Sequence, residues 1–166
     1  MKTSNSSERG IKVSANCECF VLYVAGHGGG TDKGSWLAPT NVDVNNLEGS
    51  TIGLQQFVSS ARALGGLQRL FILDTHLRHE GSSSPPLELE RNECVVHSCS
   101  PGEKASDGSA GKGSDFSRSM VEHIKKGESL LQTLQAMKLG ENQTPWITGS
   151  IGVANAPFKS VADEGK

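Results

Sequence analysis

The sequence has no long apolar run and no concentrated charge of either sign. No segment approaches the roughly 20 consecutive apolar residues of a membrane-spanning helix, and residues 1–10 contain no apolar core of signal-peptide length. The formal net charge is −2 over 166 residues, and no basic cluster with interleaved aromatic residues is present. We therefore expect a soluble cytoplasmic protein that binds neither membranes nor nucleic acid.

Cysteines and metal-binding motifs are also scarce. The four cysteines are Cys17, Cys19, Cys94 and Cys99. Because no secretory signal accompanies them, we predict free thiols rather than a disulfide framework. No C-x2-C or H-E-x-x-H motif is present, and no metal or other cofactor is predicted. The length suits one domain with a proper core and is too short for two comfortable ones.

One stretch combines a strong strand signal with a candidate catalytic side chain. Phe20–Val24 is continuously apolar, which predicts a strand buried on both faces of a parallel sheet. Gly26 and Gly28–Gly30 predict a tight turn at its carboxyl end, where open α/β sheets bind ligands. His27 lies in this turn, and His is the commonest acid–base side chain. Two alternatives are a flexible loop with a solvated His27 and a phosphate-binding loop, although no such glycine motif is present.

The rest of the chain alternates between strand-like and helix-like segments. The predicted segments are, in order, an extended piece over 35–40, a polar loop over 41–49, a helix from Ser50 or Thr51 to Leu64, a strand over Leu70–Leu73 ending at Asp74-Thr75-His76, a polar loop over 79–91, a strand over Glu93–Ser98, a long loop over 101–113, a helix from Ser114 or Asp115, a helix over Ser129–Leu139 and an edge strand over Trp146–Ile151. This order predicts an α/β fold with a mostly parallel sheet.

Four stretches taken together resemble one family, the caspase-like cysteine peptidases, which include caspases and metacaspases. They are FVLYVAGHG, LFILDTHLR, VVHSCSPGEKASD, and SDFSRSMVEHIKK with ENQTPWIT. Their order and spacing agree with the family over most of the chain. The resemblance implies a three-layer sandwich in which helices flank a mostly parallel sheet. It places an incomplete domain at 19–155, a disordered or partial segment at 1–18 and a tail at 156–166.

The resemblance also implies roles for residues at the strand ends. His27 matches the catalytic general base, and Gly28 matches part of the backbone oxyanion hole. The family's nucleophilic Cys lies two residues after the strand-ending Asp, and that position is His76 here. An imidazole is no competent replacement, and losing a nucleophile lowers turnover on the order of 10⁶-fold in a well-studied triad. The four cysteines match no strand-tip position, so we predict a catalytically deficient pseudo-peptidase.

Two carboxylates match the family's specificity pocket. In metacaspase-like members, Asp side chains at the positions of Asp74 and Asp107 receive a basic residue before the cut, which implies a pocket for Lys or Arg. The alternative is that Asp74 only caps a turn and Asp107 is a solvated loop residue, since carboxylates on loops are mostly solvated.

The amino end departs from the family, whose domain opens with two more strands and a helix before the His-bearing strand. About 18 residues precede that strand here. We therefore expect Cys19–Ala25 to form an exposed sheet edge. Such an edge can pair with a strand of another chain and lead to aggregation. Either the chain is a fragment of a longer product or a partner covers the edge. Inactive family members regulate active relatives, so an active homologous peptidase is an expected partner, beside a peptide or protein substrate.

Two other functions stay open. One is an active cysteine endopeptidase that cleaves after Lys or Arg and whose natural chain has Cys in place of His76. The other is a metal- or ligand-binding α/β module. His27 and His76 would be neighbours, His79 follows closely, and His97 with Cys99 offers a further pair, so converging imidazoles could hold Zn²⁺.

Overall fold

The computed structural model describes residues 17–79, 85–103, 105–108, 111–141 and 143–156, and for residues 76–79 the backbone alone. The predictions for the first residues and for the last, and parts of the predicted loops at 79–91 and 101–113, lie outside these ranges.

A six-stranded sheet runs through the described part of the chain in the order β3-β2-β1-β4-β5-β6. The three central strands are parallel, and they are β1 (Cys19–Thr31), β4 (Gln68–His79) and β5 (Glu93–His97). The outer strands run antiparallel to their neighbours, and they are β2 (Gly34–Leu37), β3 (Ile52–Gly53) and β6 (Trp146–Gly149). The sheet is therefore mixed, with a parallel centre, and β6 is the predicted edge strand.

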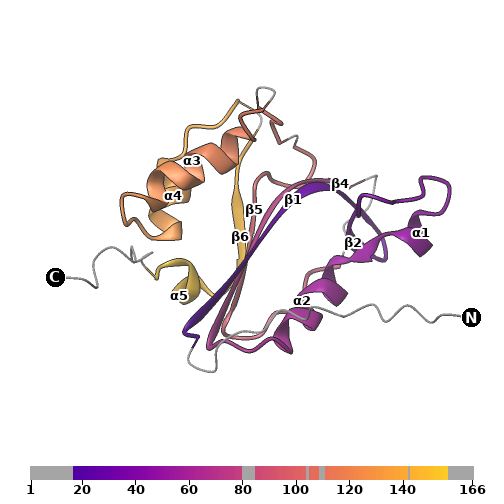
Figure 1. Ribbon diagram of the computed structural model, residues 1–166, viewed down its shortest axis with the longest axis horizontal. Helices are drawn as coiled ribbons and strands as arrows, with labels where there is room; N and C mark the ends of the chain where they lie inside the picture. The colour runs from indigo at the N-terminus through magenta and orange to yellow at the C-terminus, as the bar shows by residue number, and fades with distance from the viewer. Residues whose placement is uncertain (1–16, 80–84, 104, 109–110, 142, 157–166) are drawn as a thin grey trace, which may run out of the picture.

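Helices cover both faces of this sheet (Figure 1). On one face lies α2 (Leu54–Arg62), and on the other lie α3 (Asp115–Ile124), α4 (Leu130–Ala136) and the short α5 (Ile151–Ala154). A four-residue helix, α1 (Leu47–Ser50), stands near β2. The predicted α/β three-layer architecture is confirmed.

Strand β4 separates two apolar cores because its side chains alternate between the faces. Phe71 and Leu73 pack with the α2 core, whereas Leu70 and Ile72 pack with the α3–α4–α5 core. The first core also contains Leu37, Leu54, Val58, Ala61 and Val95, and the second contains Cys94, Val96, Phe116, Met120, Leu130, Val153 and Ala154. Each large side chain buried in this way contributes about 1.5–3 kcal/mol.

Local capping explains where two helices begin. The Ser114 hydroxyl accepts the backbone N–H of Ser117 at 2.9 Å and so caps α3. Ser129 and Gln132 form a reciprocal capping box at the start of α4. Both predicted starts are confirmed. The second helix ends at Ala136 rather than Leu139, because Met137 adopts an extended conformation.

The strand β1 differs from its prediction in two ways. Its exposure alternates, and Val21 and Tyr23 are each 44% exposed, because no helix covers them on the α3 side. The glycines form no turn, since Gly28–Gly30 continue the strand and pair with both β4 and β2. A Cβ at Gly29 would overlap the Trp36 indole on β2, so a larger residue there would require that ring to move.

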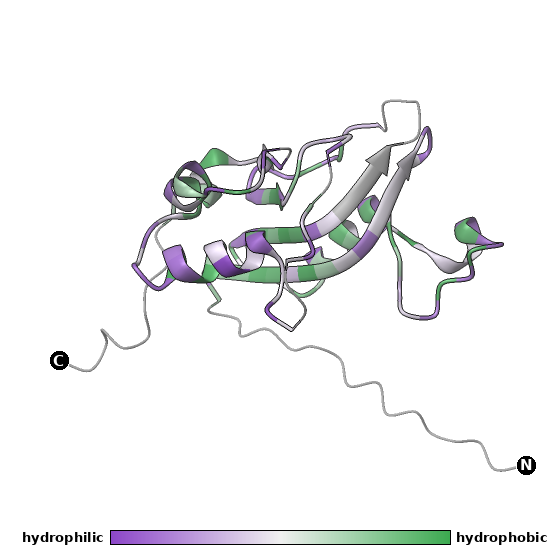
Figure 2. Ribbon diagram, turned by 90° about the horizontal axis from the view of Figure 1, so that it is seen from above, coloured by the Kyte–Doolittle hydropathy of each residue, from purple (hydrophilic) through white to green (hydrophobic). Residues whose placement is uncertain are grey.

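Three further boundaries differ from the predictions. The Ile52–Gly53 segment pairs with β2 as β3, so α2 begins at Leu54 rather than at residue 50 or 51. The polar loop at 41–49 contains most of α1, which Asn46 caps through the Gly49 N–H. The predicted strand Leu70–Leu73 is the middle of β4, which continues to His79 beside β1. Figure 2 shows these two strands running side by side past the rest of the sheet.

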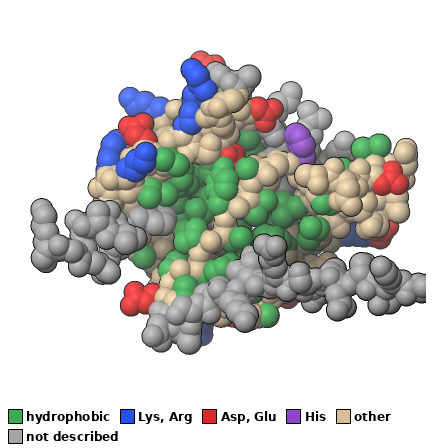
Figure 3. Space-filling view, in the orientation of Figure 1, with side chains coloured by type: hydrophobic (Ala, Val, Ile, Leu, Met, Phe, Trp, Pro, Cys, Tyr) green, Lys and Arg blue, Asp and Glu red, His purple; other side chains and the backbone are tan. Residues whose placement is uncertain are grey.

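The amino-terminal two thirds of β1 forms an edge of the described sheet. From Cys19 to His27 it pairs with β4 on one side, and β2 pairs only from Gly28 onward. In Figure 3, which faces this edge, hydrophobic side chains gather on both sides of the β1 backbone. The expected exposed edge is therefore present in the described part of the chain.

Candidate functional site

A cavity of about 270 Å³ lies beside β1 and β4, where the shorter β5 has ended. His27, Asp74 and Asp107, which the sequence singled out separately, all line it. The remaining lining residues are Tyr23, Ala25, Gly26, Gly113, Ser114 and Ser117. The fold thus brings the candidate base and both candidate specificity carboxylates to one place, on the α3 side of the sheet.

The Asp74 carboxylate is held by two hydroxyl groups. Its Oδ2 accepts a hydrogen bond from the Tyr23 phenol at 2.7 Å and another from the Ser114 hydroxyl. The side chain is nearly buried at 8% exposure. Asp74 lies within β4, in register with Ala25, rather than in a turn. These contacts join β1, β4 and the first turn of α3 through one carboxylate.

Tyr23 is the sole tyrosine of the chain, so its ionisation can be followed without interference from another phenol. Burial raises the pKa of this phenol first, and the hydrogen bond to Asp74 and the Asp74 charge raise it further. The raised pKa means that the neutral phenol stabilises the fold below about pH 10, the pKa of an unfolded tyrosine. This contribution is lost as pH rises through the higher folded pKa.

We expect the absorbance titration of Tyr23 near 295 nm to show a midpoint above that of a free tyrosine. Asp74→Asn should move the midpoint back toward the ordinary value, because the amide carries no charge. Far-UV circular dichroism at each pH separates ionisation in the folded chain from unfolding. An ordinary midpoint in the folded chain as it stands would contradict the Tyr23–Asp74 contact.

The loop that carries Asp107 is tied to the segment before β6. The Gln143 side chain is 6% exposed, donates to the Ser98 carbonyl at 3.0 Å and accepts the Ser106 N–H at 3.0 Å. The Glu103 carboxylate accepts the backbone N–H of Thr144 at 2.6 Å. This bond is the main cause that lowers the pKa of Glu103. The loop position of Asp107 therefore depends on a segment about 36 residues later.

The candidate base and the nucleophile position lie side by side on adjacent strands. His27 and His76 are register partners in the β1–β4 ladder, where neighbouring strands lie about 4.8 Å apart. The His27 side chain is exposed and lines the cavity. The side chain of His76 lies outside the described part of the structure. Gly28 lies within the sheet, in register with Leu77 on β4 and Leu37 on β2, and its oxyanion role stays a prediction.

The cysteines do not supply a replacement thiol in the cavity. None of the four forms a disulfide bond, and none lines the cavity as described. Cys94 is buried in the core, and burial raises the pKa of its thiol to about 11. Cys19 lies at the opposite end of β1. Partial burial of its thiol, and then the nearby Cys17, raise the pKa of Cys19. Raised thiol pKa values disfavour the thiolate, which is the reactive form.

The proposed zinc cluster can be assessed only in part. Among the side chains that the structure describes, no group of three or more His, Cys, Asp or Glu residues is arranged to hold a metal ion. His97 is buried and stacks on Trp146 with ring centroids 4.5 Å apart. The side chains of His76 and His79 are not described, so a cluster that uses them stays a prediction.

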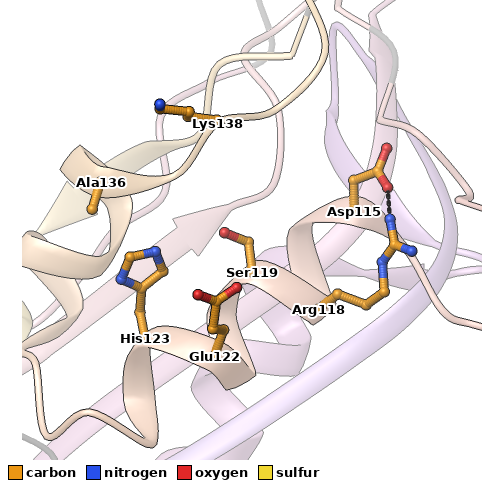
Figure 4. Close-up of a pocket in the computed structure, with 7 residues that line it drawn as sticks. All are labelled: Asp115, Arg118, Ser119, Glu122, His123, Ala136 and Lys138. Carbon is orange, nitrogen blue, oxygen red and sulfur yellow. Dashed lines mark hydrogen bonds and ion pairs between the residues drawn. The ribbon is translucent and has the colours of Figure 1, made fainter.

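A second hollow of about 490 Å³ lies outside the sheet, between α3 and the segment that follows α4. Figure 4 shows Ser119, Glu122 and His123 on α3 across from Ala136 and Lys138. Its other lining residues, Asp115 and Arg118, form an ion pair. Glu122 pairs with Lys126, and His123 contacts the Glu128 carboxylate. The hollow is thus a polar surface groove whose charged side chains are largely paired with one another. It lies away from the ends of the strands.

The residues that hold the two carboxylates in place are not evident from the sequence. In the sequence, Tyr23 belongs to an apolar strand run, Ser114 is a helix cap, and Gln143, which holds the Asp107 loop, is part of the resemblance. A hydroxyl in the middle of an apolar strand run was the available signal, because a tyrosine there needs a partner when it is buried. This signal does not identify the partners, because Tyr23 and Ser114 lie 51 and 40 residues from Asp74 along the chain.

Comparisons with known proteins agree with this fold. The caspase domain family matches residues 7–152 of the chain. Among solved structures, the crystal structure of caspase-1 from Spodoptera frugiperda is similar, with a TM-score of 0.53 and 16% sequence identity. The likeness covers 81% of this chain and 61% of that chain. A comparison with curated proteins gives no match. No helix in the described residues is long and apolar enough to cross a membrane.

Proposed function

This chain belongs to the caspase domain family, and on that premise we propose that it binds a basic side chain of a peptide or protein without cleaving the backbone. The observation that carries the proposal is the cavity in which His27, Asp74 and Asp107 meet. The chain spans 61% of the length of the solved caspase that it resembles.

The chemistry of the cavity supports a cationic ligand. Two carboxylates line it, and neither has a basic side chain as a hydrogen-bond or ion-pair partner among the described residues. Asp107 is exposed, whereas Asp74 is nearly buried, so a cation between them would be partly removed from water. Charge-assisted hydrogen bonds gain strength in such a setting. Ala25, Gly26 and Gly113 add little side-chain bulk, which leaves room for one long side chain.

The composition of the dyad supports binding without hydrolysis. Peptide cleavage by this family's route needs a thiolate that attacks the carbonyl and an imidazole that protonates the leaving amine. The chain has an imidazole at both register positions, His27 and His76. The described cavity contains no thiol. Such a domain would act by occupying a substrate or an active homologous peptidase.

We expect a fluorescent peptide with one central Lys or Arg to bind and to remain intact. Asp74→Asn and Asp107→Asn should each weaken binding about tenfold, because each removes one charge-assisted contact worth about 1.4 kcal/mol. Fluorescence anisotropy measures binding, and chromatography of the same samples measures cleavage.

The matched control is Glu122→Gln, which removes the same charge from the outer side of α3 and should leave affinity unchanged. A peptide with Gln in place of the basic residue should bind poorly to every variant. Equal affinity for the basic and Gln peptides would refute the pocket assignment. Thiol-dependent turnover by the unmodified chain would refute the loss of activity and favour an active endopeptidase.

A further inference from the structure

We propose that Tyr23 and Ser114 are specificity-determining residues that bias this cavity toward lysine over arginine. The inference rests on the proposed function, because it concerns which basic side chain the Asp74–Asp107 cavity accepts. Both residues lie in stretches that carry the family resemblance, but the resemblance assigns neither of them a role in the site. Both act through the Asp74 carboxylate, to which each donates a hydrogen bond.

The occupancy of the two Asp74 oxygens differs. A carboxylate offers about two acceptor positions on each oxygen. Both donors, the Tyr23 phenol and the Ser114 hydroxyl, use Oδ2. Among the described residues no donor reaches Oδ1. One oxygen is therefore saturated, and the other is available to a ligand.

This asymmetry acts differently on the two basic side chains. A guanidinium pairs best with a carboxylate through two parallel N–H groups, one to each oxygen. That arrangement needs Oδ2, which is already occupied. An ammonium is a compact point charge with three donors, so it can use Oδ1 of Asp74 and direct another N–H to Asp107. A lysine loses nothing to the two hydroxyl groups, whereas an arginine loses its bidentate pairing.

The surroundings of the two hydroxyl groups fix their roles as donors to Asp74. Ser114 Oγ accepts the Ser117 backbone N–H at 2.9 Å as the cap of α3, which orients its own hydrogen away from the helix. Burial, and then the Asp74 carboxylate, raise the pKa of the Tyr23 phenol, so it remains a donor over the neutral pH range. Stacking of an arginine on the Tyr23 ring would oppose the bias, but a partly exposed cation–π contact is weaker than a charge-assisted hydrogen bond.

The test compares two fluorescent peptides that differ only in a central Lys or Arg. For the chain as it stands, we expect the Lys peptide to bind several-fold more tightly. Tyr23→Phe keeps the ring but removes the donor, and Ser114→Ala removes the other donor. Each variant should shift the Lys-to-Arg affinity ratio at least threefold toward Arg, mainly by strengthening Arg binding, whereas a purely structural defect would weaken both peptides.

Conservative and distant variants complete the test. Ser114→Thr retains both the hydroxyl and the cap, so it should keep the original ratio, and Ser119→Ala on the outer side of α3 should not alter it. A ratio that favours Arg in the unmodified chain, or one that neither Tyr23→Phe nor Ser114→Ala changes, would overturn the inference. If neither peptide binds the unmodified chain, the proposed function itself fails and the inference falls with it.

Discussion

A His76→Cys variant is expected to cleave Lys- or Arg-containing peptides in a thiol-dependent manner, whereas the chain as it stands should not. Positions 27 and 76 are register partners on adjacent parallel strands, so a thiol at 76 would start beside the His27 imidazole. A neighbouring imidazole lowers the pKa of a thiol and supplies the proton for the leaving amine. The rise in turnover should span several orders of magnitude, since a nucleophile is worth on the order of 10⁶-fold.

The measurement is the release of a fluorophore from a Lys-containing peptide amide, with and without a thiol-alkylating reagent. His76→Ser is the matched control, because a hydroxyl beside the same imidazole lacks the acidity of a thiol. Adding His27→Ala to His76→Cys should abolish the gain. If His76→Cys binds the peptide but stays inactive, position 76 is not the vacated nucleophile position.

A Glu93→Ala variant is expected to lose about 3 kcal/mol of unfolding free energy, a large share of the 5–15 kcal/mol typical of a domain. The Glu93 side chain is fully buried at the start of β5. It accepts hydrogen bonds from Arg62 Nε at 2.9 Å and Arg62 Nη2 at 2.8 Å. Arg69 on β4 approaches it at 3.3 Å. Removing the carboxylate leaves the two guanidinium groups with only the half-exposed Glu90 as a shared anion, and it removes one link between α2 and the sheet.

The estimate lies at the low end for a broken buried pair because the Arg62 side chain is 27% exposed and can recover some hydration. Urea unfolding followed by circular dichroism measures the change. Glu48→Ala is the control, since the Lys33–Glu48 pair has the same 2.8 Å separation but both side chains are largely exposed. That variant should unfold at an unchanged urea concentration. Similar midpoints for the two variants would show that the Glu93 cluster does not hold α2 against the sheet.

The same carboxylate predicts a pH dependence. Burial opposes ionisation of Glu93, but hydrogen bonds from Arg62 and the Glu90 N–H and the nearby positive charges outweigh it and lower the pKa. A lowered pKa adds stability above the unfolded value of about 4.3, and this is lost as pH falls through the folded pKa. Glu93→Gln should therefore flatten the acid limb of the stability profile below about pH 4.3. If Glu93→Gln left the loss of stability at low pH unchanged, the lowered pKa of Glu93 would be contradicted.

The elements that depend on near neighbours could be predicted from the sequence. The Leu70–Leu73 run is apolar in every position and becomes the centre of β4, with both faces covered. Ser114 and Ser129 start helices because their hydroxyl groups reach N–H groups three residues ahead. The candidate residues His27, Asp74 and Asp107 follow from the resemblance, and the fold places them around one cavity.

Elements whose state depends on distant neighbours could not be predicted in the same way. The apolar run of β1 indicates a strand, but whether Val21 is buried depends on a helix that does not reach it. Ile52 fits the helical spacing of α2, yet it pairs with Leu37 because β2 offers an open edge there. In both cases the local sequence is compatible with two structures: a buried or an exposed side chain for Val21, and a helix or a strand for Ile52. Contacts with distant parts of the chain determine which one forms.

The sequence by itself carried the resemblance to the family, the order of the segments that form the central strands, and the identities of His27 and His76 at the positions that the resemblance assigns to the dyad. Only the tertiary structure decided what surrounds Asp74. Tyr23 and Ser114 lie 51 and 40 residues away along the chain and reach the same carboxylate oxygen. Such contacts form when β1, β4 and α3 pack together, and no local propensity encodes them. The contacts of Tyr23 and Ser114 with Asp74 are therefore the part of the site that a sequence motif does not reveal.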